Sequence, residues 1–282
     1  MQTEKKKGSA AMGTYQGNFM RAESKYLLTL SQYRLLMSAL KGKLVPDKYP
    51  EYALRSIYFD TDDDIMIRRS IEKTQYKEKL RLRSYGEADG STTVFLEIKK
   101  KYQGIVGKRR ISLPYRTATE YLAARAVGEK PPDIPLRDGE RQIFSEIDYL
   151  VGLYRPVPKQ YVYYEREAFT YAEDSEVRIT FDKNITGRRE NLTLGGENYG
   201  SVIIGDDMRL MEVKVPGCIP FEISRILSVL EIRPTSFSKY GTFYKEYILQ
   251  NQREEPSCLK ASAPSANPAR LSSLRPQPSF AQ

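Results

Sequence analysis

Residues 79–83 read Lys-Leu-Arg-Leu-Arg, and this short alternation decides the fold. In a β-strand, the side chains of residues i and i+2 point to the same face of the sheet. Lys79, Arg81 and Arg83 therefore share one face, and Leu80 and Leu82 share the other. The segment predicts a strand that buries its leucines and presents three positive charges on the opposite face.

The same spacing recurs along the chain, where charged residues stand two or four positions apart with largely apolar residues between them. The pairs are Glu23 with Lys25, Glu97 with Lys99, Lys108 with Arg110, Arg178 with Asp182, and Glu212 with Lys214. Together they predict a sheet with one buried face and one charged face. Bases outnumber acids on the charged face, and like charges on neighbouring strands repel, so the pattern favours a bound polyanion.

Turn residues and helix-capping residues divide the chain into further elements. Strands are expected at residues 22–28, 54–60, 77–84, 92–100, 107–113, 160–171, 176–182, 189–194 and 209–215. Helices are expected at 31–40 with Ser31 as N-cap, after a capping box of Thr117 and Glu120, after Asp138, from Pro220, and at 240–250. This order predicts an α+β domain or a barrel with helices outside it.

The domain boundaries follow from composition. We expect a flexible leader at residues 1–19, one domain at 20–252, and a disordered Ser/Pro-rich tail at 253–282. The Lys-rich residues 1–11 lack the apolar stretch of a secretory signal, and no apolar run is long enough for a transmembrane helix. The only cysteines, Cys218 and Cys258, form no metal or disulfide motif, which favours a reducing, cytoplasmic location.

The chain has 282 residues, a formal net charge of +9 and no histidine. The charge favours acidic partners: nucleotides, polyphosphate, nucleic acid or an anionic membrane surface. The lack of histidine excludes Ser-His-Asp catalysis, histidine metal ligands and a histidine general base within the chain. Any metal ion would be held by carboxylates, and these suit Mg²⁺ or Mn²⁺.

Two other interpretations of the charged face remain open. It could be the solvated side of an ordinary antiparallel sheet, or a platform for single-stranded nucleic acid. Nucleic-acid platforms stack bases on aromatic side chains, and Phe95 and Tyr164 are the clearest aromatic residues on this face. This scarcity favours phosphate recognition over base recognition. No P-loop, GxGxxG or kinase signature is present.

Nine short motifs, in this order, resemble the VTC-type polyphosphate polymerase domain of the triphosphate tunnel metalloenzymes. They are Arg-Ala-Glu-Ser-Lys-Tyr at 21–26, Ser-Ile-Tyr-Phe-Asp at 56–60, Lys-Leu-Arg-Leu-Arg-Ser-Tyr-Gly at 79–86, Phe-Leu-Glu-Ile-Lys at 95–99, Gly-Lys-Arg-Arg at 107–110, Tyr-Glu-Arg-Glu-Ala-Phe at 164–169, Val-Arg-Ile-Thr-Phe-Asp at 177–182, Leu-Met-Glu-Val-Lys at 210–214 and Ser-Phe-Ser-Lys-Tyr at 236–240. The resemblance covers residues 21–250. It implies an α+β fold with a closed antiparallel β-barrel, a triphosphate tunnel, and helices packed outside.

The resemblance also implies roles for individual residues. The residues with catalytic roles would be Lys25, Arg81, Arg83, Arg166, Arg178 and Glu212. Further phosphate-binding residues would be Lys99, Lys108, Arg110, Lys214, Ser238 and Lys239. Tyr164 would contact the nucleobase, and Glu212, Glu23 and Glu97 would hold the metal. Two simpler interpretations stay open: Glu23 and Glu97 could form ion pairs with Lys25, Lys99 or their neighbours, and Lys79 could lie at the rim. Asp60 is interpreted as a turn residue.

One position departs from the wider superfamily. The hydrolase branch begins with Glu-x-Glu-x-Lys, and Arg21 replaces its first glutamate, which fits the VTC branch better. The implied activity is metal-dependent transfer of the γ-phosphate of ATP or another NTP to a growing polyphosphate chain, with Mn²⁺ or Mg²⁺. Triphosphate and pyrophosphate are further expected ligands, no specific nucleic acid is expected, and a membrane partner and the oligomeric state stay open. The alternatives are an inorganic triphosphatase and a non-catalytic polyphosphate- or nucleotide-binding module.

Overall fold

Residues 22–254 are described by the computed structural model, with side chains described for residues 22–249. The predicted leader, Arg21, Cys258 and the tail beyond residue 254 lie outside the described residues. The chain divides into two compact units, Met1–Lys245 and Glu246–Gln282. The sheet and the cavity described below belong to the first unit. None of the helices within residues 22–254 is long and apolar enough to cross a membrane.

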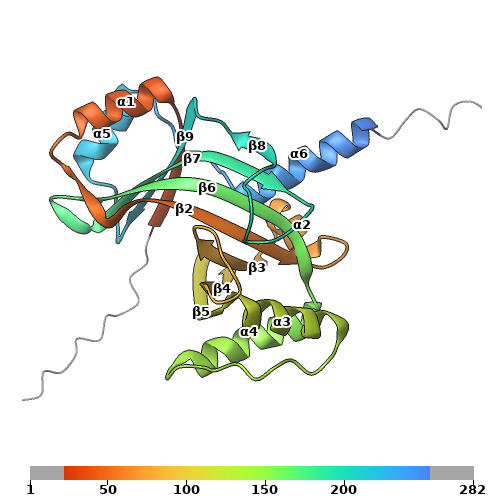
Figure 1. The fold of residues 1–282 in the computed structure, drawn as a ribbon. Helices are drawn as coiled ribbons and strands as arrows, with labels where there is room; N and C mark the ends of the chain where they lie inside the picture. Colours follow the sequence, from red (N-terminus) through yellow and green to blue (C-terminus); the bar gives the residue numbers. More distant parts are fainter. Residues whose placement is uncertain (1–21, 255–282) are drawn as a thin grey trace, which may run out of the picture. The chain divides into compact units, whose positions relative to one another are not determined.

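Nine antiparallel strands form one sheet in the first unit (Figure 1). Eight of them follow the order β1-β9-β7-β6-β2-β3-β4-β5, and β8 pairs with β7 beside this path. The strands are β1 (Ala22–Thr29), β2 (Leu44–Asp60), β3 (Tyr76–Tyr85), β4 (Thr93–Tyr102), β5 (Ile105–Pro114), β6 (Val157–Tyr171), β7 (Asp174–Arg188), β8 (Ser201–Ile204) and β9 (Met208–Val215).

The expected closed barrel is wrong, because the sheet is open. Among the strands of the described part of the chain, β1 pairs only with β9 and β5 pairs only with β4, so the strand order does not close on itself. Both edges carry bases toward the same cavity: Lys25 on β1, and Lys108 and Arg110 on β5. The segment before the last helix lies at the edge of β1 instead: the backbone nitrogen of Thr235 donates to the carbonyl oxygen of Lys25 at 2.7 Å, and Tyr26 forms an isolated bridge with Pro234.

The alternation at residues 79–83 sets the two faces as predicted. Leu80 and Leu82 are fully buried, and they pair in register with Ile98 and Leu96 of β4. Arg81 stands opposite Glu97 on the other face of the same two strands. Burial of the leucine face therefore directs the charged residues of β3 and β4 to the inner face of the sheet.

Helices cover the outer face in two separate groups (Figure 1). One apolar core joins β2–β5 to α2, α3 and α4, and the other joins β1, β7 and β9 to α1 and α5. The sixth helix, α6, begins beside the inner face with Lys239. The helices are α1 (Leu30–Ala39), α2 (Ile65–Ile71), α3 (Tyr115–Val127), α4 (Glu140–Tyr154), α5 (Phe221–Val229) and α6 (Lys239–Glu254).

Three predicted helix starts are displaced. The N-cap of α1 is Thr29 and not Ser31, because Thr29 and Gln32 form a complete capping box at the end of β1. The capping box of Thr117 and Glu120 is wrong: α3 starts at Tyr115, directly after Pro114. Asp138 does not cap α4, which follows Gly139 in a left-handed conformation.

The strand predicted at 189–194 is also wrong. β7 continues to Arg188, and the chain then forms an irregular loop around the Arg188 side chain. Its guanidinium donates hydrogen bonds to the carbonyl oxygens of Asn191 and Tyr199, at 3.2 Å and 3.1 Å. Leu194 is buried in the core cluster nonetheless, so the apolar alternation is real although the backbone is not a strand. The sequence prediction missed α2 and β8.

Candidate functional site

A cavity of about 390 Å³ lies on the inner face of the sheet. Every strand except β8 contributes to its lining, as does the first turn of α6. All fifteen predicted site residues line it: Glu23, Lys25, Arg81, Arg83, Glu97, Lys99, Lys108, Arg110, Tyr164, Arg166, Arg178, Glu212, Lys214, Ser238 and Lys239. The structure therefore brings the predicted residues into one place, and their individual roles stay predictions.

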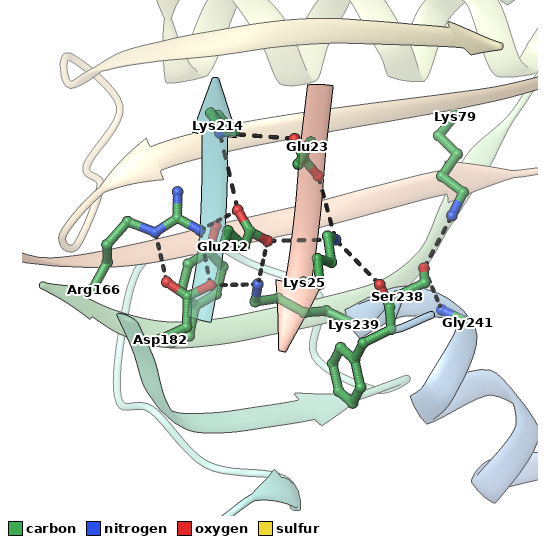
Figure 2. Close-up of polar contacts among 12 residues, drawn as sticks. Glu23, Lys25, Lys79, Arg166, Asp182, Glu212, Lys214, Ser238, Lys239 and Gly241 are labelled. Carbon is green, nitrogen blue, oxygen red and sulfur yellow. Dashed lines mark hydrogen bonds and ion pairs between the residues drawn. The ribbon is translucent and has the colours of Figure 1, made fainter. Parts of the chain in front are cut away.

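Glu212 stands at the meeting point of four bases (Figure 2). Its carboxylate oxygens lie 3.1 Å from Arg166 Nη2, 3.4 Å from Lys25 Nζ, 3.5 Å from Lys239 Nζ and 4.0 Å from Lys214 Nζ. Burial by itself would raise the pKa of Glu212, but Lys239, Arg166 and Lys25 outweigh it and hold the pKa well below its usual range. Glu212 is therefore ionised, and its negative charge offsets the positive charges of the four surrounding bases.

Asp182 holds two of these bases from behind the cavity. Arg166 donates Nε to Oδ1 at 2.6 Å and Nη2 to Oδ2 at 2.8 Å, and Lys239 donates to Oδ2 at 2.5 Å. Asp182 is fully buried and does not line the cavity. Arg166, Asp182, Lys239 and Glu212 form a closed ring of contacts, which we call the Asp182 network.

The opposite wall repeats this arrangement around Glu97. The Glu97 carboxylate lies 2.5 Å from Arg81 Nε and 3.0 Å from Lys108 Nζ, with Arg83 and Arg110 each 3.9 Å away. Burial would raise the pKa of Glu97, but Arg81, Arg83 and Lys108 together lower it to about 2. The two walls are thus built alike, with one carboxylate enclosed by four bases on each.

Lys79 also lines the cavity. Its ammonium donates to Ser238 Oγ at 3.1 Å, and Ser238 Oγ also accepts from the backbone nitrogen of Gly241 in the first turn of α6 (Figure 2). Burial, together with Lys99, Lys25 and Arg81, lowers the pKa of Lys79 to about 8. Lys79 is therefore a cation whose charge responds to pH close to neutrality.

Tyr164 is enclosed in the cavity wall. The ring is only 2% exposed, its hydroxyl accepts from Arg83 Nη2 at 3.0 Å, and Lys239 Nζ lies 4.4 Å from the ring centroid. Arg166 lies 5.3 Å from the same centroid. The aromatic ring thus already supports two cations of the Asp182 network, and its predicted contact with a nucleobase stays a prediction.

Several lining residues were not selected from the sequence. Thr180 is buried on β7, and its hydroxyl has no hydrogen-bond partner among the described residues, which leaves a polar atom at the cavity wall. Three tyrosines also line the cavity: Tyr52, Tyr58 and Tyr85. Burial would raise the pKa of Tyr58, but Arg81, Arg83 and Lys79 lower it to about 8. Thr180 and Tyr85 could have been selected from the sequence, because each lies two positions after a predicted site residue: Thr180 follows Arg178, and Tyr85 follows Arg83.

Asp60 is more than a turn residue. It is fully buried, and its carboxylate accepts from the backbone nitrogens of Thr61, Met66 and Ile67, and from the Tyr240 hydroxyl at 3.0 Å. These contacts tie the start of α2 to the start of α6. Asp60 therefore positions Ser238 and Lys239 indirectly, by anchoring Tyr240 in the first turn of α6.

The carboxylates can be tested against the needs of a divalent cation. Within residues 22–254 no group of three or more acidic, cysteine or histidine residues forms a ready-made metal site. Mg²⁺ is typically held by one or two carboxylates and by substrate phosphates, so a smaller set suffices. Glu212 and Glu23 fit such a set, because both contact the same two lysines, Lys25 and Lys214, and the two carboxylates therefore lie near each other at the cavity. Glu97 fits less well, because within the described residues its bases Arg81 and Lys108 form no ion pair with a second carboxylate.

Glu23 and Glu97 also make the ion pairs that the sequence left open. Glu23 lies 3.7 Å from Lys25, and Glu97 pairs with Arg81 and Lys108, which are neighbours of Lys99 in the sheet. The ion-pair interpretation is confirmed for both glutamates. Metal binding by Glu23 or Glu97 stays a prediction.

The chain is similar in sequence to a vacuolar transporter chaperone subunit and in fold to several solved structures. It is 29% identical over 224 residues to vacuolar transporter chaperone complex subunit 4 of Schizosaccharomyces pombe, covering 71% of this chain and 31% of the relative. The chain thus matches about a third of that protein's length. Two solved structures are similar at 14% identity: a putative adenylate cyclase from Bacillus halodurans, with a TM-score of 0.46, and a putative adenylyl cyclase from Hippeastrum, reported with a dominant triphosphatase activity, with a TM-score of 0.45. They cover 77% and 80% of this chain, and 92% and 96% of their own chains.

The family assignment rests on a match to most of the chain. The model of the VTC domain family matches residues 20–247, which include the whole sheet and every residue that lines the cavity. The resemblance inferred from the nine short motifs is confirmed at this level. This chain belongs to the VTC domain family.

Proposed function

We propose that this VTC domain is a polyphosphate polymerase, which transfers the γ-phosphate of an NTP to the end of a polyphosphate chain. The observation that carries the proposal is the charge of the cavity. Three glutamates line it against a larger set of bases: Lys25, Lys79, Arg81, Arg83, Lys99, Lys108, Arg110, Arg166, Arg178, Lys214 and Lys239. Walls with this excess of positive charge complement a ligand that carries a negative charge at every repeat, and a polyphosphate chain is such a ligand.

The residues present suit phosphoryl transfer. In this reaction the enzyme mainly positions the reacting groups and stabilises charge. The terminal phosphate of a polyphosphate chain is already an ionised nucleophile, so the transfer needs no histidine as general base. Arg81 and Arg83 on one wall, and Arg166 on the other, are held by buried carboxylates and can bind phosphate oxygens with little loss of side-chain freedom.

We propose that Glu212, with Glu23 beside it, holds Mn²⁺ or Mg²⁺ together with the phosphates of the substrate. A divalent ion bound there would neutralise charge on the reacting phosphates. In this proposal the surrounding bases keep the Glu212 carboxylate ionised, so that it can bind the cation, and the low pKa of Glu212 supports this. A cytoplasmic location stays a separate proposal, and a membrane partner and the oligomeric state stay open.

One incubation separates the proposal from its alternatives. The protein is incubated with ATP and Mn²⁺, and ADP, free phosphate and long-chain polyphosphate are measured in the same sample. Polymer formed together with ADP supports the polymerase. Free phosphate without polymer, at any metal or primer concentration, moves the assignment to an inorganic triphosphatase. Binding of ATP or tripolyphosphate without turnover moves it to a binding module.

A further inference from the structure

Three aromatic side chains meet at one end of the cavity, where β3 ends. Tyr85 is the last residue of β3, and its ring centroid lies 5.5 Å from that of Tyr52 and 5.7 Å from that of Phe95. Arg110 lies over Phe95, 4.7 Å from its centroid. We call Tyr52, Tyr85 and Phe95 the Tyr85 cluster. Tyr52 and Tyr85 line the cavity, and Tyr85 is 48% exposed.

The exposure of Tyr85 is unusual for this site. Of the other tyrosines that line the cavity, Tyr58 is 7% exposed and Tyr164 is 2% exposed. Tyr52 and Phe95 both contact the Tyr85 ring, at interplanar angles of 54° and 89°. An aromatic ring that is held in place and still half open to solvent offers a surface for stacking.

The position of Tyr85 along β3 connects it to the phosphate-binding bases. Lys79, Arg81, Arg83 and Tyr85 occupy alternate positions of one strand, and all four line the cavity. Alternate residues of a strand lie about 6.6 Å apart, so β3 presents three cations in a row that ends in an aromatic ring. This order matches an extended nucleoside triphosphate, which has phosphates at one end and a flat aromatic base at the other.

We propose that the Tyr85 cluster is a stacking site for the base of a nucleotide whose phosphates lie along Arg83 and Arg81. The inference rests on the proposed function in one respect, that an NTP occupies this cavity. Tyr164 suits this role less well, because Lys239 and Arg166 already lie against its ring and are fixed there by Asp182.

The site predicts a particular selectivity. Base stacking on aromatic side chains tolerates any base, because every base has a π-face, and larger bases stack better. The cluster should therefore favour nucleotides over a triphosphate without a base, and purines over pyrimidines. Its role is to select the NTP and to fix its orientation, with the γ-phosphate directed along β3 toward Lys79.

The test measures equilibrium binding of ATP, CTP and tripolyphosphate by calorimetry, in the presence of Mg²⁺. The variants are Tyr85→Ala and Tyr85→Phe, with Tyr102→Ala as control, because Tyr102 is similarly exposed, at 52%, and does not line the cavity. In Tyr85→Ala we expect ATP to bind roughly tenfold more weakly and CTP to lose less affinity, with tripolyphosphate unchanged. Tyr85→Phe should bind all three ligands like the wild type.

The outcomes also separate this inference from the proposed function. Equal losses for ATP and tripolyphosphate in Tyr85→Ala would overturn the stacking site, because a structural defect acts on both ligands. Unchanged ATP binding in this variant would overturn it as well, even if the protein makes polymer. A protein that makes no polymer, but loses ATP and not tripolyphosphate affinity in Tyr85→Ala, has the stacking site without the polymerase activity. Thermal melting of each variant without ligand verifies that it is folded.

Discussion

Arg166 and Asp182 form a bidentate ion pair beneath the cavity, with nitrogen–oxygen distances of 2.6 Å and 2.8 Å. Asp182 is fully buried and Arg166 is 8% exposed, so water screens this pair very little. Asp182 also accepts from Lys239, and the two bases then reach Glu212. Two bases that line the cavity are thus oriented by one carboxylate that does not.

Asp182→Asn should therefore destabilise the fold and weaken ligand binding together. Removing one partner of a buried ion pair leaves an uncompensated charge and costs about 3–5 kcal/mol. Urea unfolding should report this loss, and tripolyphosphate should restore part of it, because phosphate can neutralise Arg166 and Lys239. The matched control is Asp47→Asn, which removes the partner of the half-exposed Arg178 and should cost less than about 1 kcal/mol. Equal stability losses in the two variants would contradict the positioning role of Asp182.

The sequence predicted the contents of the cavity well, and the reason is local. The alternation of charged and apolar residues fixes which side of each strand faces the core, and Leu80 and Leu82 show this most clearly. Once the core face is fixed, Arg81 and Arg83 can only point to the inner face. The same logic placed Lys25, Glu212 and Lys214 correctly, although they come from opposite ends of the chain.

The closure of the sheet could not be predicted in this way. Whether β1 and β5 pair depends on the edges of strands that are distant in sequence, and no local spacing encodes it. The N-cap of α1 was missed for a related reason. Thr29 is both the last residue of β1 and the N-cap of α1, so its role depends on where the preceding strand ends. Thr180 and Tyr85 were missed because they carry no charge, although they share the alternation of their charged neighbours.

Glu212→Gln should abolish metal-dependent turnover and also lower the stability of the ligand-free protein. The carboxylate compensates Arg166, Lys239, Lys25 and Lys214, so its neutralisation leaves these bases to repel one another. We expect a lower melting temperature without ligand and a larger stabilisation by tripolyphosphate than in the wild type. Activity is measured as polymer formed from ATP with increasing Mn²⁺, and Glu231→Gln at an exposed position is the control. Wild-type rates in Glu212→Gln would remove this residue from the site.

Binding of tripolyphosphate should weaken as the pH rises through about 8, because Lys79 has a pKa of about 8 there. Above this pH Lys79 loses its positive charge while the ligand keeps its negative charge. Tyr58, whose pKa is also about 8, gains a negative charge over the same range and acts in the same direction. The other charged groups around Lys79 are Arg81, Lys99 and Lys25.

The contribution of Lys79 to the stability of the ligand-free protein should instead increase as the pH rises. The folded pKa of Lys79 lies below the usual value of 10.5, so the unfolded chain holds more protons between about pH 8 and 10.5 and the Lys79 contribution to stability rises over this range. Dissociation constants for tripolyphosphate at pH 7 and pH 9 test the binding effect. Lys79→Gln should reduce the difference between them, and an equal pH dependence in both proteins would exclude Lys79 as its source.

Thr180→Val should weaken phosphate binding without harming the fold. The Thr180 hydroxyl is buried at the cavity wall next to Arg178 and Glu212, and no residue in the described part of the chain hydrogen-bonds to it. A buried hydroxyl without a partner costs free energy, so valine of nearly the same shape should leave the stability unchanged or slightly higher. If a bound phosphate supplies the missing acceptor, loss of this hydrogen bond costs about 0.5–1.5 kcal/mol, which corresponds to a roughly twofold to thirteenfold higher dissociation constant for tripolyphosphate. Thr180→Ser keeps the hydroxyl and should bind like the wild type. Equal affinities in the valine and serine variants would show that the hydroxyl does not contact the ligand.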